Sequence, residues 1–392
     1  MPTTAISRDA DRIAHYRAHP ETGPRILFFS GGSALRALSR ALKLLTHNSV
    51  HLITPFDSGG SSAHLREAFG MPSLGDVRNR LLALADETQR GAREIYNLVS
   101  YRFPDDADPT ELRHRLEHMR DGADPLVADI PGAMQQSIAA HLGTFLDHMP
   151  PSFDLRGASI GNLVLAGGYL NHDRDIRSVI FSFSRLLEVR GTVRPIVTDD
   201  LQLAAKLDDG TTILGQHLIT GKNAKPLTCR IADLYLVRDL QEGRRADVPI
   251  DTETRALITN ADLIVFPMGS FYTSVIANLL PRGVGRAIAD ARCRKIYVPS
   301  TGTDPEQIGL TMADAVERII RFARRDAGTH VPLHSLLDSV LVDTAGDAYV
   351  VRLDLDRITS WGINVLGAAM VSADERRRLA PDVLAEILVS LC

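Results

Sequence analysis

The stretch that decides the fold is RILFFSGGS, residues 25–33. Its first five residues form a short apolar run, which is typical of a parallel strand buried on both faces. A loop with two glycines follows, and apolar residues then recur at the spacing of one helix face from Leu35 to Leu45. The order of strand, glycine loop and helix predicts one unit of an α/β sheet.

The same order returns further along the chain. An apolar run at 50–56 leads into DSGGSS and a helical stretch, and another at 262–266 leads through PMGS into a predicted helix over 271–280. A strand over 295–299 and an amphipathic helix over 312–325 extend the pattern. Such repetition predicts an α/β fold with a doubly wound, mainly parallel sheet.

The remaining segments are interpreted as additions to this sheet. Residues 1–24 are expected to form a polar arm before a single domain over 25–392. Residues 75–150 are heavily charged and are predicted to be helical. Residues 201–214 are predicted to form a hairpin around an Asp-Asp-Gly turn. The last 60 residues combine a strand-like segment, YVVRLDL, with a terminal helix over 381–391.

Composition excludes several classes of protein. The net charge of −4 lacks the basic excess of a dedicated nucleic-acid binder. No apolar run reaches the roughly 18–20 residues that cross a bilayer. Cys229, Cys293 and Cys392 form an odd, scattered set, which is not the pattern of a disulfide framework and lacks the spacing of zinc ligands. We therefore expect a cytoplasmic protein with no nucleic-acid or membrane partner.

Gly31, Gly32 and Ser33 are candidates for binding phosphate. A loop without Cβ atoms lets a phosphate approach backbone N–H groups, and the dipole of the following helix favours negative charge. The loop matches neither the dinucleotide fingerprint nor the Walker motif, so a nicotinamide oxidoreductase would rest on fold class alone. A tight turn with no ligand is an equally open interpretation.

Asp57 and Asp76 are candidates for holding one Mg²⁺. Asp57 follows a predicted strand directly and Asp76 stands at a predicted helix start, beside a second glycine loop at Gly59, Gly60 and Ser61. Carboxylate oxygens and a substrate phosphate are ligands that Mg²⁺ prefers. The alternative is that Asp57 is a turn residue and Asp76 an N-cap.

Further polar residues at loop and helix starts could contact a nucleotide. Arg66 and Arg78 could pair with a diphosphate, because a guanidinium matches phosphate oxygens, although a surface ion pair is the commoner role of an arginine. The single tryptophan, Trp361, is interpreted as a packing residue. Other candidates for base, sugar or phosphate contacts, each of which could instead cap a helix or form a turn, are Asn79, Asn162, Gly269, Ser270 and Tyr272.

Taken together, six blocks of the sequence resemble the CofD/YvcK superfamily. They occur in order over about residues 25–392, and the wording of GGSS-x-x-LR and GDVRN is nearer the YvcK branch. The blocks are FFSGGSALRALSRALK, ITPFDSGGSSAHLREAFGMPSLGDVRNRLLALAD, GASIGNLVLAGGYL, LQLAAKLDDGTTILG, ADLIVFPMGSFYTSVIANLLPRGVGRAIADA and PDVLAEILVSL.

The resemblance implies a Rossmann-like α/β/α sandwich with a nucleotide site over the first glycine loop. It implies metal and catalytic positions at Asp57 and Asp76, and a helical insertion at about 104–155. CofD-type proteins move 2-phospho-L-lactate from a GDP-linked donor to a deazaflavin precursor with Mg²⁺, whereas YvcK-type proteins resemble UDP-sugar-binding regulators of carbon metabolism and cell-wall supply.

Two functions follow as expectations. The first is a Mg²⁺-dependent transferase that uses a nucleoside-diphosphate-linked donor, because the acidic pair is kept. The second is a non-catalytic UDP-sugar-binding regulator, because Ser58 stands where the family commonly has a second aspartate. A homodimer is the default expectation for either.

Overall fold

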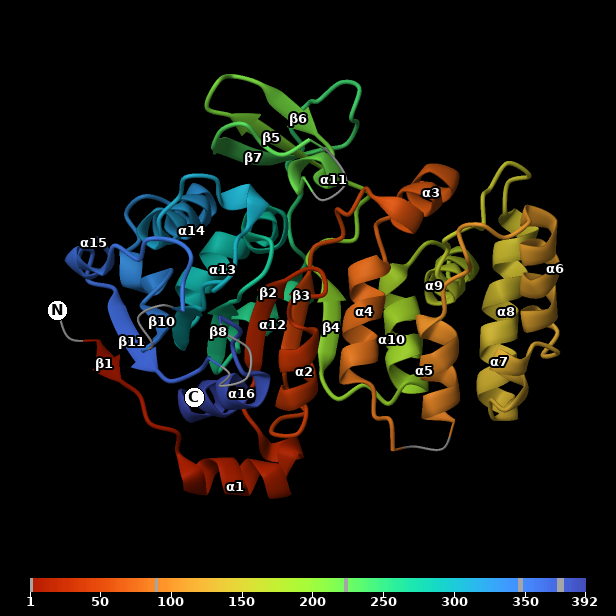
Figure 1. Ribbon diagram of the computed structural model, residues 1–392, viewed down its shortest axis with the longest axis horizontal. Helices are drawn as coiled ribbons and strands as arrows, with labels where there is room; N and C mark the ends of the chain where they lie inside the picture. The colour runs from red at the N-terminus through yellow and green to blue at the C-terminus, as the bar shows by residue number, and fades with distance from the viewer. Residues whose placement is uncertain (1–2, 89–90, 222–224, 345–347, 372–376) are drawn as a thin grey trace.

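The computed structural model describes residues 3–88, 91–221, 225–344, 348–371 and 377–392. Its centre is an eight-stranded sheet in the order β1-β11-β10-β9-β8-β2-β3-β4, and every neighbouring pair in it is parallel (Figure 1). The expected doubly wound α/β fold is confirmed. The strands are β1 Thr4–Ala5, β2 Ile26–Ser30, β3 Val50–Ile53, β4 Thr192–Pro195, β8 Leu263–Phe266, β9 Arg294–Tyr297, β10 Ser339–Asp343 and β11 Asn364–Ala368.

The winding of the sheet reverses between β2 and β8. From β2 the chain adds β3 and then β4 on one side, and from β8 it adds β9, β10 and β11 on the other. In open α/β sheets, ligands bind outside the carboxyl ends of the strands at such a reversal. The glycine loops after β2 and β8 both lie at this point.

Helices cover both faces of the sheet. Alternation along β2 puts Leu27 and Phe29 into a core shared with α12, α13 and α14, and Ile26 and Phe28 into a core shared with α1, α2 and α16. All five residues of β2 are buried. The helices of these layers are α1 Ala10–Ala18, α2 Arg36–Leu42, α12 Thr252–Thr259, α13 Val284–Asp290, α14 Met312–Ala327, α15 Leu355–Ser360 and α16 Pro381–Ser390.

A helical layer with a core of its own extends from β4. The predicted helical segment between residues 75 and 150 forms part of this layer, in which α8 packs against α9 (Figure 1). The helices expected in the 104–155 insertion are α6, α7 and α8. The whole set is α3 Gly60–Phe69, α4 Gly75–Leu84, α5 Ala92–Ser100, α6 Pro109–Arg120, α7 Pro125–Ala128, α8 Gly132–His148, α9 Ile160–Asn171 and α10 Ile176–Leu186.

The predicted hairpin is confirmed and belongs to a small antiparallel sheet. Strands β5 Gln202–Leu207 and β6 Thr212–Leu214 pair with each other, and β5 also pairs with β7 Ile231–Val237. A short helix, α11 Gln216–Ile219, follows the hairpin and lies close to the start of α3 (Figure 1).

Three expectations need correction. Residues 3–24 are no separate arm, because β1 pairs with β11 and Ile13 of α1 enters the core. The stretch YVVRLDL is not a strand; β10 and β11 flank it, and Leu355 begins α15. The predicted helix over 271–280 is a π turn, Phe271–Val275, followed by a 3₁₀ turn, Ile276–Leu279.

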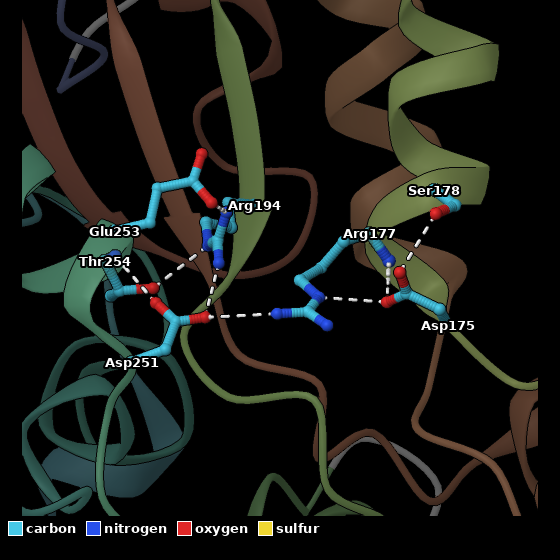
Figure 2. A network of polar contacts seen from close by, with 7 residues as sticks. All are labelled: Asp175, Arg177, Ser178, Arg194, Asp251, Glu253 and Thr254. Atoms are coloured by element: carbon cyan, nitrogen blue, oxygen red, sulfur yellow. Dashed lines mark hydrogen bonds and ion pairs between the residues drawn. The ribbon is translucent and has the colours of Figure 1, made fainter.

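Edge strand β4 is held by a polar network (Figure 2). The Arg194 side chain, which is 10% exposed, donates to Thr254 Oγ1 at 3.0 Å and to the carboxylates of Glu253 and Asp251 at the start of α12. Arg177 Nη1 lies 3.9 Å from Asp251 and so connects α10 to the same network. These contacts fasten the helical layer to the sheet. Among the described helices, none is both long and apolar enough to span a membrane.

Candidate functional site

A polar cavity of about 240 Å³ lies at the reversal between β2 and β8. We call it the switch-point cavity. It is walled by the predicted glycine loops at Gly31–Ser33 and Gly269–Ser270 and by the loop after β9. Most of its polar side chains are hydroxyls, and one carboxylate, Asp304, also lines it. The lining residues are Ser30, Gly31, Gly32, Ser33, Ala34, Leu35, Met268, Gly269, Ser270, Ser274, Ser300, Thr303, Asp304 and Pro305.

Asp76 and Arg80 hold the first glycine loop from one face of α4. Asp76 Oδ2 accepts the backbone N–H of Gly32 at 2.6 Å, and the N-cap position of α4 is Leu74 rather than Asp76. Arg80 is 1% exposed and donates from Nη2 to the carbonyls of Gly31 and Gly32 at 3.3 and 3.5 Å. Burial lowers the pKa of Arg80 to about 10, against the opposing effect of Asp76, so the guanidinium stays charged at neutral pH.

Gly31 is required by close approach of neighbouring hydroxyls. A Cβ at this position would stand 2.6 Å from Ser274 Oγ and 2.9 Å from Thr54 Oγ1. Asn278 Nδ2 donates to the Ser30 carbonyl at 3.0 Å and fixes the end of β2. The buried atoms Ser30 Oγ and Asn278 Oδ1 have no hydrogen-bond partner in the described structure. The loop is therefore firmly placed, with polar atoms available beside the cavity.

The second glycine loop is bound to carboxylates rather than left open for phosphate. Asp304 Oδ2 accepts the N–H of Phe271 at 2.7 Å, and Glu306 Oε2 accepts those of Tyr272 and Thr273 at 2.7 and 2.8 Å. These contacts occupy the N–H groups at the start of the helical segment and accompany its irregular π and 3₁₀ turns. Burial, with the nearby charge of Asp304, raises the pKa of Glu306 to about 8.

Tyr272 cannot contact a ligand in this structure, contrary to prediction. Its side chain is fully buried, its hydroxyl donates to the Ile231 carbonyl at 3.1 Å, and Arg318 Nε donates to that hydroxyl at 3.2 Å. Gly269, with φ of 140°, and Ser270 do line the switch-point cavity. The sequence offered no sign of Asp304 and Glu306, since both lie more than 30 residues from the loop that they bind.

Asp57 lies close to Gly75, the residue before Asp76. Its Oδ1 accepts the N–H of Gly59 at 3.1 Å, which is the turn contact expected for an aspartate after a strand. A Cβ on Gly75 would stand 3.9 Å from Asp57 Oδ2 and 4.0 Å from Asn162 Nδ2. Asp57 and Asn162 therefore lie beside the start of α4, the helix that carries Asp76.

Asn162 is 2% exposed and has one unused oxygen. Its Nδ2 donates to Ser61 Oγ at 3.2 Å, while its Oδ1 is buried without a hydrogen-bond partner in the described structure. Carboxylate and amide oxygens are ligands of the kind that Mg²⁺ takes. The described residues contain no group of three or more His, Cys, Asp or Glu side chains that could hold a metal. A cation at this place would therefore need the carboxylate and amide oxygens together with oxygens of a bound phosphate ligand.

Ser58 forms a pair with His217 that the sequence did not reveal. Ser58 Oγ lies 2.9 Å from His217 Nδ1 and accepts the backbone N–H of His217 at 3.2 Å. A Cβ on Gly59 would stand 3.3 Å from His217 Cβ and 3.6 Å from Asp57 Oδ1. The small sheet therefore brings a histidine over the Asp57 turn, in the position next to Ser58.

Arg66 and Arg78 do not line the switch-point cavity. Arg66 is 5% exposed and donates to Asp200 Oδ1 at 2.5 Å and to the carbonyls of Asp57 and Leu201. Arg78 is 8% exposed and donates to Ser159 Oγ and to Asn79 Oδ1. Both anchor loops around the site, and Asn79 serves as a partner of Arg78. Gly60, with φ of 50°, begins α3.

Other arginines line the space next to the switch-point cavity. A groove of about 1010 Å³ shares Ser33, Ala34, Met268 and Ser300 with that cavity, and we call it the arginine groove. Arg36 and Arg40 lie one turn apart on α2 and donate to the Tyr96 hydroxyl at 2.6 and 2.9 Å. The remaining residues of the groove are Ala37, Leu38, Thr301, Arg378, Leu379, Ala380, Pro381, Asp382 and Leu384.

This fold and cavity define a Rossmann-like α/β protein with its candidate site at the topological reversal of the sheet. Comparison with protein families is consistent with that class. The chain belongs to the family described as 2-phospho-L-lactate transferase CofD, whose model matches residues 26–371.

The relatives and solved structures support the same assignment. The chain is 30% identical over 298 residues to a gluconeogenesis factor of Halalkalibacterium halodurans, which covers 75% of this chain and 72% of the relative. It is 29% identical over 297 residues to the gluconeogenesis factor of Bacillus subtilis, covering 76% and 74%. A crystal structure of a UPF0052-family protein from Bacillus halodurans superposes with a TM-score of 0.67 at 25% identity, over 93% of this chain and 98% of that one.

Proposed function

We propose that the switch-point cavity and the arginine groove together bind a nucleoside-diphosphate-linked ligand. The observation that carries this proposal is their continuity at the reversal between β2 and β8, where open α/β sheets bind ligands. The diphosphate would lie at the shared residues Ser33 and Ala34, near the backbone of the first glycine loop. Arg36, Arg40 and Arg378 supply positive charge on the groove side, in the role that the sequence had suggested for Arg66 and Arg78.

The residues around Gly75 fit a bound Mg²⁺. Asp57, Asp76 and Asn162 would hold it, since Asn162 Oδ1 is buried without a partner and an oxygen donor set suits this ion. Bound there, Mg²⁺ would offset phosphate charge. The protein's own part is to fix the glycine loop through Asp76 and Arg80, so that the backbone meets the ligand in one conformation.

We further propose that ligand binding serves a regulatory role in carbon metabolism. The relatives above carry the name gluconeogenesis factor, and Ser58 stands where the family commonly has a second aspartate, which removes a possible metal ligand or proton acceptor for transfer. In this chain, Ser58 is engaged by His217 on α11. The ligand would then act as a signal, with the UDP-sugar class as the expected occupant.

A Mg²⁺-dependent transferase is the second candidate function. The family model is described by a transferase activity, and His217 offers a proton acceptor close to Asp57 for an acceptor hydroxyl. Transfer chemistry at phosphorus depends mostly on positioning and electrostatics. His217→Asn would then abolish turnover while sparing ligand binding, whereas a regulator would show no turnover to lose.

A thermal-shift panel tests the shared proposal and separates its two forms. It would compare GDP, GTP, UDP, UDP-N-acetylglucosamine and NAD, each with and without Mg²⁺. A ligand at about 100 times its Kd stabilises the fold by about 2.7 kcal/mol. A UDP-sugar shift without product formation supports the regulator. A guanine-selective shift that requires Mg²⁺ supports the transferase, and no shift with any nucleotide would refute both.

A further inference from the structure

A second cavity lies on the outer side of α14, apart from the candidate site. It has a volume of about 420 Å³ and shares no lining residue with the switch-point cavity or the arginine groove. Glu317, Ile320, Arg321 and Arg324 line it from α14, at the spacing that places residues on one helix face. Trp361 and Leu333 provide apolar walls from the segments beside the helix. We call it the Trp361 cavity.

Two arginines of this cavity have no carboxylate partner among the described ion pairs. Arg321 Nη2 donates to the Ala232 carbonyl and Arg324 Nη2 to the Val331 carbonyl, each at 2.8 Å. The Nε atoms of both are buried and lack a hydrogen-bond partner in the described structure.

The acidic residues nearby are already paired with other arginines. Glu317 Oε2 accepts from Arg357 at 2.5 Å, and Asp233 is held by Arg245 and Arg325. Burial mainly, and then the charges of Arg318 and Arg325, lower the pKa of Arg321 against the opposing effect of Asp233. The cavity therefore combines apolar walls with a local excess of positive charge.

We propose that the Trp361 cavity binds a small organic anion, an apolar ring or chain that carries a carboxylate or phosphate group. The anionic group would accept from the guanidinium groups of Arg321 and Arg324, and the apolar part would pack against Trp361, Ile320 and Leu333. A guanidinium suits a planar or tetrahedral oxyanion. A ligand pocket with apolar walls and a few converging polar groups has this composition.

The cavity is connected to the candidate site through α14. Arg318, one turn before Arg321, donates to the Tyr272 hydroxyl at 3.2 Å, and the Tyr272 N–H is bound to Glu306. An anion bound in the Trp361 cavity would thus contact the helix that supports the second glycine loop.

Intrinsic fluorescence tests the proposal directly, because Trp361 is the only tryptophan in the chain. The full-length protein would be titrated with phenyl phosphate, with inorganic phosphate as the probe without an apolar part and benzyl alcohol as the probe without charge. We expect a saturable change with phenyl phosphate and an affinity at least about tenfold weaker for either control, because inorganic phosphate lacks the apolar contact and benzyl alcohol lacks the charged one.

Variants assign the binding to the arginines. Arg324→Met and, separately, Arg321→Met keep the apolar stem and should each weaken phenyl phosphate binding about tenfold or more. The control is Arg255→Met, on α12, whose exposed ion pair with Asp290 lies outside the cavity linings. Circular dichroism would establish that each variant is folded. If one arginine variant does not fold, the other one still tests the proposal.

Several results would overturn the proposal. No saturable change up to about 10 mM phenyl phosphate would exclude a specific site. Equal affinity for inorganic phosphate would show a bare anion site, and equal affinity for benzyl alcohol an apolar one. Unchanged binding in both arginine variants would remove Arg321 and Arg324 from it.

Discussion

Asp76 Oδ2 accepts the backbone N–H of Gly32 at 2.6 Å, so a carboxylate of α4 holds the loop that follows β2. The contact places an acidic side chain beneath the loop expected to meet a diphosphate. It also means that Asp76 has a structural role whatever else it binds. Substitutions must therefore separate the hydrogen bond from the charge.

Asp76→Asn should remove Mg²⁺-dependent ligand binding while leaving the fold intact. The amide oxygen can still accept from Gly32, so we expect the free energy of unfolding to fall by no more than about 1 kcal/mol. Thermal shifts with a nucleotide, with and without Mg²⁺, measure the effect. A variant that keeps the full Mg²⁺-dependent shift would rule out Asp76 as a cation ligand.

Arg80→Met should destabilise the protein strongly. The fully buried guanidinium donates to two loop carbonyls and to Ser39 Oγ. Its loss leaves these acceptors without a donor, which should lower the free energy of unfolding by about 2–4 kcal/mol. Denaturant unfolding measures the change. The matched control is Arg244→Met, at an exposed ion pair with Glu242, for which about 0–0.5 kcal/mol is expected. Similar values for both variants would contradict the assigned role of Arg80.

Arg36→Met should weaken nucleotide binding without lowering stability much. Arg36 is exposed at the rim of the arginine groove, and its Nη2 contact is the Tyr96 hydroxyl. Loss of one charge-assisted phosphate contact corresponds to about a tenfold loss of affinity or more. Calorimetric titration would measure it. Tyr96→Phe removes the hydroxyl but keeps the arginine and should bind normally; unchanged binding by Arg36→Met would place the diphosphate elsewhere.

Glu306→Gln should change how stability depends on pH. The pKa of Glu306 is raised to about 8 from an ordinary value of 4.5, mainly by burial. The folded state therefore holds a proton that the unfolded state releases, so this group's contribution is complete below pH 4.5 and is lost as pH rises through about 8. Gln keeps an acceptor for the N–H groups of Tyr272 and Thr273 but does not titrate.

Melting temperatures across that pH interval test the Glu306 prediction. The wild type should lose stability toward the alkaline end relative to Glu306→Gln, and the difference between them should grow with pH. A constant difference at every pH would show that Glu306 is already ionised in the folded protein.

Arg194→Met should loosen the attachment of β4 to α12. Burial would raise the pKa of Asp251, but the N–H of Thr254 and the Arg194 charge lower it. A lowered pKa adds stability above about pH 3.8 that is lost on acidification through the folded pKa. We expect the free energy of unfolding to fall by about 2 kcal/mol at neutral pH. This difference from the wild type should become smaller in acid. Arg177→Met, at a 52% exposed side chain, is the control; an equal loss there would contradict the assignment.

The local patterns of the sequence determined the sheet and its loops. Residues 25–29 are apolar apart from Arg25 and lie between a Gly-Pro turn and a glycine pair, and this pattern predicted β2 to within one residue at each end. The same reasoning placed β3, β8, β9 and α14. A strand that is buried on both faces shows as a short apolar run, and a helix that is buried on one face shows the helical period. The prediction of a strand at YVVRLDL was wrong, because an alternating pattern is a local property whereas a strand also needs a free sheet edge to pair with.

Only the tertiary structure decided the partners within the site. Asp76 and Arg80 are four residues apart on one helix, and their shared face could have suggested that Arg80 joins Asp76. Ser58 and His217 are 159 residues apart, and Glu306 lies 33 residues from the Thr273 N–H that it binds. Such contacts arise where the sheet brings separate loops to one edge. Hydrogen bonding and burial determine which side chains of these loops pair at that edge. Local periodicity of the sequence carries no information on which loops will meet.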